Sequence, residues 1–309
     1  MKVRYGLPTA PPAITTIGVY YGLENGFFRE EGLDVEVTPY PGSTTAVRAL
    51  LSREAEIVMT GGDTAYLAQA NGAPIKIISS PVAKGTDVVV ATKSVGSLKD
   101  LVGKRWGISQ PNDTSHVAAK ILAEKNGIDP NRIEFLSIGG PADRARALLT
   151  GRVDASSMTI LILKPILDAI DAGEVKVLAS LAAEFPDLPL AYNITRDDIV
   201  KDQAQAQLLS RFLKAEIKGY RWAQDNPEKA APIAMKYIRE VEQSLMERGM
   251  KGMSELKVYG LDGGITLEGI EKTQKQLVER GALRAVIKTD EVATVQFAEA
   301  AVKELGPAK

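Results

Sequence analysis

The strongest constraint on the fold is a repeat within the first half of the chain. Four short segments recur in the same order roughly 100 residues later, which is the pattern of a duplicated structural unit. The matching pairs are residues 4–7 with 105–108, 32–34 with 127–129, 48–52 with 146–150, and 59–60 with 158–159. One such match could arise by chance between similar strand–helix units, but four in register are harder to dismiss. We therefore predict two homologous lobes.

Each lobe alternates strand-like apolar segments with amphipathic helical segments. The expected strands cover residues 2–7, 35–37, 57–59, 75–80, 105–109, 133–138, 155–159 and 175–181. This alternation is typical of an α/β protein, and we predict a mixed, mainly parallel sheet flanked by helices in each lobe. Lobe 1 would comprise residues 1–84 and 194–309, with a helical C-terminal part, and lobe 2 residues 85–193. The two chain crossings, near residues 80–87 and 190–195, would form a hinge that permits closure around a ligand.

One strand, loop and helix between residues 105 and 122 illustrates the expected site. Asp113, Thr114 and Ser115 are all good N-cap residues, and apolar residues follow at helical spacing. Such a helix directs free backbone N–H groups and the positive end of its dipole beyond the strand end. An ordinary capped helix without a ligand is the simpler interpretation of this segment alone.

Polar loops follow the strands of both lobes, where ligands bind in open α/β sheets. Facing lobes would enclose a cleft lined by residues 8–12, 42–45, 60–64, 109–116, 139–141 and 159. These loops contain no Lys or Arg, since Arg144 lies just past one loop and Lys164 follows the last strand. An anion would then be held by helix N-termini, hydroxyl groups and backbone N–H groups. This chemistry suits a small organic acid or a neutral polar heterocycle.

Composition excludes several classes of function. With no cysteine, the chain has no disulfide, thiolate metal site or cysteine nucleophile. A net charge of −1 without a basic block gives no reason to expect nucleic acid as a partner. No apolar run approaches the ~20 residues of a membrane span.

Catalysis and metal binding have little support in the sequence. His116 is the only histidine, so a histidine general base would have to use it. Asp63 and Asp113 could contribute to a metal site, but no set of three or four ligands is evident, and Asp in such loops is more often a cap. Dinucleotide and phosphate-loop spacings are absent. We expect no metal, no cofactor and no enzymatic activity.

The chain resembles the type 2 periplasmic solute-binding proteins of ABC importers, in the branch that serves nitrate, taurine, sulfonates and thiamine-pyrimidine precursors. The segments that carry the resemblance are residues 22–33 (G-x-x-x-G-F-F-x-x-x-G-L), 50–63, 98–107, 148–155 (L-x-x-G-x-V-D-A), 266–269 and 277–283. Two departures matter. Met158, Thr159 and Ile160 stand where sulfonate-type members tend to carry aromatic residues, and the cysteine cluster of the eukaryotic pyrimidine synthases is missing.

The resemblance implies the type 2 periplasmic-binding-protein fold and the ligand-binding positions. Carried over onto the cleft segments, the expected substrate-binding residues are Thr9, Ser43, Thr44, Gly62, Asp63, Ser109, Asp113, Thr114, Ser115, His116, Gly140 and Thr159. In particular, Ser109 and residues 113–116 should face Thr9 across the cleft.

The resemblance also implies the function. We expect the substrate-binding component of an ABC importer, a monomer that captures a small organic solute and docks transiently on an inner-membrane permease. It would be periplasmic, or lipid-anchored outside the cytoplasmic membrane, with its signal peptide removed. The alternative is a cytoplasmic enzyme on the same two-lobe scaffold that acts on a small metabolite. A signal peptide in the native gene, and neighbouring permease and ATPase genes, would distinguish the two. A ligand-sensing domain is a third possibility, disfavoured because no DNA-binding or signalling segment is attached.

Overall fold

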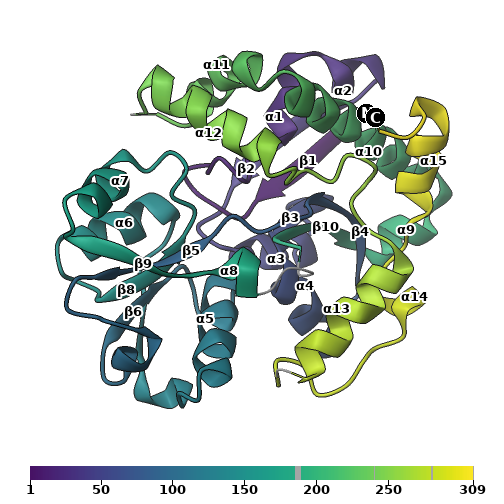
Figure 1. Ribbon diagram of the computed structural model, residues 1–309. Helices are drawn as coiled ribbons and strands as arrows, with labels where there is room; N and C mark the ends of the chain where they lie inside the picture. Colours follow the sequence, from purple (N-terminus) through teal and green to yellow (C-terminus); the bar gives the residue numbers. More distant parts are fainter. Residues whose placement is uncertain (185–188, 240, 280, 309) are drawn as a thin grey trace.

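The computed structural model describes residues 1–184, 189–239, 241–279 and 281–308, and it shows two five-stranded sheets flanked by helices (Figure 1). The first sheet contains β1 Lys2–Leu7, β2 Asp34–Pro39, β3 Ile57–Gly61, β4 Ile75–Val82 and β10 Ala191–Arg196. The second sheet contains β5 Val88–Thr92, β6 Arg105–Ile108, β7 Glu134–Ser137, β8 Ala155–Met158 and β9 Val175–Ser180. We call the first sheet with its helices lobe 1 and the second lobe 2.

The two sheets have the same topology. Their strand orders are β2-β1-β3-β10-β4 and β7-β6-β8-β5-β9. The central strand of each repeat, β1 or β6, pairs in parallel with two neighbours. One strand of opposite direction, β10 or β5, is inserted beside them and pairs antiparallel on both sides. The prediction of a two-lobed α/β fold with mixed, mainly parallel sheets is confirmed.

An arginine–carboxylate pair occurs at the same place in both lobes. Arg4 on β1 donates Nε–H and Nη2–H to the two carboxylate oxygens of Glu56, and its backbone N–H donates to the same group. Arg105 on β6 makes the same three contacts with Asp154, both side-chain distances being 3.0 Å. The hydrogen bonds from Arg105 lower the pKa of Asp154. Bidentate arginine–carboxylate pairs require a specific geometry. Their presence at equivalent positions shows that the repeat in the sequence extends to the tertiary structure.

Helices cover both lobes. Those of lobe 1 are α1 Val19–Glu24, α2 Phe27–Glu30, α3 Ser43–Leu51, α4 Gly62–Ala70, α9 Asp197–Lys201, α10 Gln203–Asp225, α11 Pro227–Tyr237, α12 Gln243–Glu255, α13 Leu267–Glu279, α14 Thr289–Val292 and α15 Gln296–Leu305. Those of lobe 2 are α5 Thr114–Lys125, α6 Pro141–Leu149, α7 Lys164–Asp171 and α8 Leu181–Glu184, with short 3-10 helices at Leu98–Leu101 and Pro130–Arg132. Apolar spacing from Ile14 to Phe28 predicts one helix, but α1 and α2 are separate because Gly26 adopts φ 78°. None of the helices within the described ranges is long and apolar enough to cross a bilayer.

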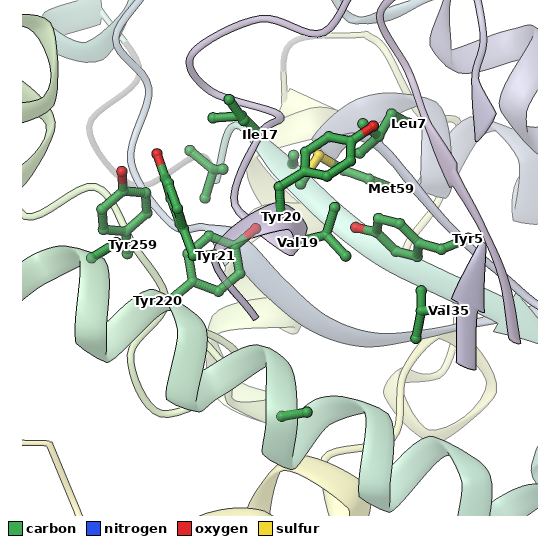
Figure 2. Close-up of a cluster of buried hydrophobic side chains, with 14 of the residues drawn as sticks. Tyr5, Leu7, Ile17, Val19, Tyr20, Tyr21, Val35, Met59, Tyr220 and Tyr259 are labelled. Atoms are coloured by element: carbon green, nitrogen blue, oxygen red, sulfur yellow. The ribbon is translucent and has the colours of Figure 1, made fainter. Parts of the chain in front are cut away.

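The core of lobe 1 lies between the first sheet and the long helix α10. Figure 2 shows its cluster of buried tyrosine and aliphatic side chains, with Tyr5 from β1 and Tyr220 from α10 among them. Tyr5 also packs against Phe212 of α10, with ring centroids 5.2 Å apart. Because β1 ends directly at the cleft, this packing holds the cleft edge of lobe 1 in place.

The chain passes between the lobes twice. It leaves lobe 1 through residues 83–87, between β4 and β5, and returns between α8 and β10. The expected second crossing at residues 190–195 is not a connection, because β10 pairs with both β3 and β4 from Ala191 onward. Residues 191–193, which the predicted division assigns to lobe 2, therefore lie in the sheet of lobe 1. The return crossing lies before them and falls partly outside the described residues.

Candidate functional site

A cavity lies between the lobes at the carboxyl ends of the parallel strands. It encloses about 680 Å³ of space between atoms, part of which is continuous with solvent. The predicted binding residues that line it are Thr9, Ser43, Ser109, Asp113, Thr114, Ser115, Gly140 and Thr159. A second cavity, of about 480 Å³ including space open to solvent, is lined by Gly62 and Asp63, and it shares Thr114 and Ser115 with the first. The structure thus brings together residues from both lobes, as a binding cleft requires.

Two predicted residues lie elsewhere. The ring of His116 packs edge-on against Phe135, with centroids 4.8 Å apart, and its Nδ1 accepts a hydrogen bond from the backbone N–H of Asn112. His116 lines neither cavity, so its predicted place in the pocket is wrong. Burial lowers its pKa. Thr44 is also absent from both linings, and it instead contacts the backbone oxygen of Pro111 across the cleft at 3.5 Å.

Asp113 organises the lobe 2 side of the cleft. It is the N-cap of α5, as its sequence context predicts, and accepts hydrogen bonds from the backbone N–H groups of Ser115 and His116. It also accepts from the hydroxyl groups of Ser109 and Ser115. Burial of Asp113 is nearly complete, so these four donors replace water around its carboxylate. The hydroxyl groups of Ser109 and Ser115 are consequently committed to Asp113 and position the loop.

Replacing Asp113 with alanine is expected to destabilise the protein by about 1–2 kcal/mol, because four donors lose their acceptor. Asp202 is a matched control, since it caps α10 but accepts only the backbone N–H groups of Ala204 and Gln205. We expect a smaller loss, about 1 kcal/mol, for Asp202→Ala. Urea unfolding of both variants measures the difference. A loss for Asp113→Ala that is no larger than that for Asp202→Ala would contradict this account.

On the lobe 1 side, the hydroxyl groups support the backbone. Ser43 is buried and accepts a hydrogen bond of 3.0 Å from the N–H of Gly61 at the end of β3. It does not cap α3, whose N-cap is Gly42. Thr9 pairs with Thr16 at 2.8 Å between their hydroxyl oxygens. The hydroxyl groups of Ser43 and Thr9 thus stabilise the loops by hydrogen bonding, and both residues line the cavity.

The lobes touch each other beside the cavity. Thr45 donates to Oε1 of Gln110 at 3.1 Å, and the hydroxyl oxygens of Thr64 and Thr114 are 3.5 Å apart. Gly61 of lobe 1 lies so close to Thr114 of lobe 2 that an added Cβ would be 1.2 Å from Oγ1 of Thr114. The absence of a side chain at Gly61 therefore allows this approach of lobe 2.

Asp63 is a buried carboxylate at this contact. It lies in the first turn of α4 and accepts a hydrogen bond of 2.9 Å from the backbone N–H of Thr64. Burial raises its pKa to about 6, a hydrogen bond from Thr114 of lobe 2 opposes the rise, and the charge of Asp113 adds to it. The carboxylate of Asp63 is thus coupled electrostatically to both lobes.

Sequence reasoning missed two charged residues of the cleft, Arg144 and Asp87. Arg144 lines the first cavity, and Asp87 lines both. The strand-end loops contain no Lys or Arg, but the lining of the cleft also includes Arg144 of α6. Arg144 lies in the first turn of α6. The sequence prediction considered only loop residues as lining the cleft and therefore left it out. Asp87 lies in the first crossing. The sequence feature that could have indicated it is an isolated acidic residue directly before an apolar strand.

A family comparison identifies the class of protein. The profile of the family described as NMT1/THI5 like matches residues 13–230, more than half of the chain. The chain belongs to the NMT1/THI5-like family. The predicted resemblance is confirmed, since named relatives of this NMT1/THI5-like chain include solute-binding proteins.

Two relatives of the NMT1/THI5-like chain cover most of its length. The formylaminopyrimidine-binding protein of Halalkalibacterium halodurans is 25% identical over 235 residues, covering 73% of this chain and 67% of the relative. The taurine-binding periplasmic protein of Escherichia coli is 22% identical over 245 residues, covering 79% of this chain and 72% of the relative.

Solved structures share the fold of this NMT1/THI5-like chain. A protein from Bordetella bronchiseptica aligns with a TM-score of 0.84 at 19% identity, over 99% of this chain and 98% of the other. The nitrate-binding protein NrtA of Synechocystis aligns with a TM-score of 0.76 at 16% identity, over 99% and 90%. The desulfurization enzyme DszB aligns with a TM-score of 0.61 at 14% identity, over 98% and 99%. The fold is therefore that of periplasmic binding proteins, and it also carries an enzyme.

The arrangement of this NMT1/THI5-like cleft suits binding. Its groups are hydroxyls, backbone N–H groups, carboxylates and one guanidinium, which can fix the orientation of a small polar ligand. Within the described residues, no group of three or more His, Asp or Glu side chains is placed to hold a metal ion. Since His116 lies outside both cavities, a hydroxyl of the cleft has no histidine base beside it.

Proposed function

We propose that this protein is the substrate-binding component of an ABC importer and captures a small organic solute between its lobes by hinge closure. The observation that carries the proposal is the cavity between two lobes of equal topology, which is lined by Ser, Thr, Asp and Arg residues among others. Two crossings connect the lobes, which touch at Thr114. A cavity between lobes that can separate admits a solute and then encloses it.

The relatives support this proposal. One is named for binding formylaminopyrimidine and another for binding taurine in the periplasm. Both solutes are small and polar, as expected for a cavity lined by hydroxyl groups and charges. We accordingly place this protein in the periplasm, or lipid-anchored outside the cytoplasmic membrane, as a monomer that docks transiently on a permease. A signal peptide in the native gene would support this location.

A solute screen with a measurement of shape tests the proposed function. We expect at least one small polar solute to raise the melting temperature. A ligand at a free concentration of 100 times its Kd stabilises a protein by about 2.7 kcal/mol. The same solute should reduce the radius of gyration in small-angle X-ray scattering, because closure brings the lobes together. If the solutes found in the screen bind tightly and none of them reduces the radius of gyration, hinge closure is contradicted.

An enzyme on this scaffold is the second candidate, because the desulfurization enzyme DszB shares the fold. The discriminating measurement is mass spectrometry of the solute after incubation with stoichiometric protein. A transport protein releases its solute unchanged, whereas an enzyme converts it. Recovery of a product would replace the transport proposal.

A further inference from the structure

The guanidinium of Arg144 is buried in the cleft, and two of its nitrogen atoms have no hydrogen-bond partner among the described residues. Arg144 is only 5% exposed and lines the first cavity. Its Nε and Nη1 atoms are buried, and neither has a hydrogen-bond partner in the described part of the chain. A buried cation with unpaired N–H groups is costly, and native proteins normally satisfy such groups. The described residues therefore supply no hydrogen-bond partner for these two N–H groups of Arg144.

The nearest acids do not provide that partner. Asp87 and Asp113 both interact electrostatically with Arg144, although burial is the main influence and lowers its pKa. No ion pair within 4.0 Å joins Arg144 to either acid among the described residues. Asp113 already accepts four hydrogen bonds from its own loop. Asp113 thus balances part of the charge of Arg144 from a distance.

A second unpartnered group lies in the same cavity. Thr159 follows β8, is 4% exposed, and its hydroxyl has no hydrogen-bond partner in the described residues. Arg144 and Thr159 both line the cavity, and both can donate hydrogen bonds. Two unsatisfied donors in one cavity suit an oxyanion, because a guanidinium binds carboxylate and sulfonate oxygens well.

Asp87 limits the total charge of that ligand. Asp87 lines both cavities, and no described residue donates a hydrogen bond to its carboxylate. Burial raises the pKa of Asp87, and the charge of Arg144 opposes the rise. A simple anion would satisfy Arg144 but repel Asp87, whereas a neutral heterocycle would leave Arg144 unpaired. A molecule with both an acidic and a basic group satisfies both residues.

We propose that the solute is a small zwitterion, whose carboxylate or sulfonate binds Arg144 and Thr159 and whose ammonium group faces Asp87. This inference rests on the proposed function, since it assigns the class of solute to the same cleft. It replaces the broader expectation of an organic acid or neutral heterocycle. It also assigns specificity to Arg144 and Asp87, neither of which is among the residues that the sequence predicts.

The test uses small probes that differ in one charged group. Taurine and β-alanine carry both charges, ethanesulfonate and propanoate carry only the acid, and propylamine carries only the amine. Calorimetric titration should show that each zwitterion binds the wild-type protein at least about tenfold more tightly than its acid-only or amine-only counterpart. Equal binding of propanoate and β-alanine, or binding of none of the probes, would overturn the proposal.

Variants separate the roles of the two charges. Arg144→Gln should lower zwitterion affinity at least about tenfold, and Asp87→Asn should abolish the preference for zwitterions over plain acids. Arg146 is the control, since it lies on the same helix, is exposed and pairs with Asp143. We expect Arg146→Gln to bind all probes as the wild type does. Unchanged affinity of Arg144→Gln would remove Arg144 from the site.

A thermal measurement without any ligand distinguishes a binding role from a structural one. Arg144→Met keeps the length of the side chain and removes the unpaired buried charge, so we expect a higher melting temperature for the ligand-free variant. A structural arginine would give a lower one, which would contradict the proposal.

The outcomes also distinguish this inference from the proposed function. A neutral solute from the screen that compacts the protein would leave the function standing and overturn the zwitterion. Zwitterion probes that bind without compaction would support the subsite and contradict the closing mechanism.

Discussion

Replacing Gly61 with alanine is expected to lower solute affinity by at least about tenfold, because the new methyl group would occupy the position of Thr114 in the closed cleft. The added Cβ would lie 1.2 Å from Oγ1 of Thr114 and 2.5 Å from its Cβ. The backbone of Gly61, with φ −61° and ψ 151°, suits alanine without strain. The three nearest heavy atoms all belong to Thr114, so lobe 1 itself should accommodate the change. The variant should fold, and its lobes should fail to meet.

Three measurements check this prediction. Calorimetric titration with the solute found by screening gives the affinity, and scattering shows whether compaction is lost. Gly252→Ala on α12 is the matched control, because its added Cβ meets only Leu161 at an ordinary 3.5 Å. Adding Thr114→Gly to Gly61→Ala should restore part of the affinity by removing the obstructing side chain. A Gly61→Ala protein that binds and compacts like the wild type would show that the lobes do not close along this contact.

Glu216→Gln is expected to stabilise the protein at alkaline pH by a few kcal/mol, because it removes a buried carboxylate that ionises unfavourably. Glu216 lies on α10 inside lobe 1 and is 2% exposed. Its two oxygens accept hydrogen bonds of 2.9 and 2.8 Å from Nδ2 of Asn193 on β10, which also donates to Ser79. Burial raises the pKa of Glu216 to about 8, while the contact with Asn193 opposes the rise. Glutamine keeps an acceptor for Asn193 and cannot ionise.

The sign of the pH effect follows from proton linkage. The folded state of the wild type holds the proton of Glu216 up to about pH 8, whereas the unfolded chain releases it near its ordinary value of 4.5. The free energy of unfolding contributed by this group therefore falls as the pH rises from about 4.5 to 8, and levels off above 8. Urea unfolding of both proteins at acidic, neutral and alkaline pH measures it, and the difference between them cancels the other titrating groups. A difference that stays constant with pH would contradict the raised pKa.

Local sequence patterns predicted the strand-end loops well. Asp113 before Thr114 and Ser115 predicts an N-cap, and the structure has that cap, because side-chain capping depends only on residues two and three positions away. Local context does not decide the role of Ser43, whose hydroxyl accepts a hydrogen bond from the N–H of Gly61 on a neighbouring strand. The sequence predicts His116 in the pocket because its loop faces the cleft, but its ring packs against Phe135, which follows it by nearly twenty residues.

Residue order within the chain determined the two-lobed α/β fold of this protein. A duplicated strand–helix pattern needs only a periodicity of apolar residues, which is a local property, and the matched pairs Arg4–Glu56 and Arg105–Asp154 show that the duplication extends to tertiary contacts. Only the tertiary structure decided which charges face the solute. Arg144, Asp87 and Thr159 come from a helix, a crossing and a strand end, and they meet because α6, β5 and β8 pack together in lobe 2, where Val88 pairs with Met158. No local pattern encodes their burial in that cavity, where neither Arg144 nor Asp87 has a side-chain hydrogen-bond partner among the described residues.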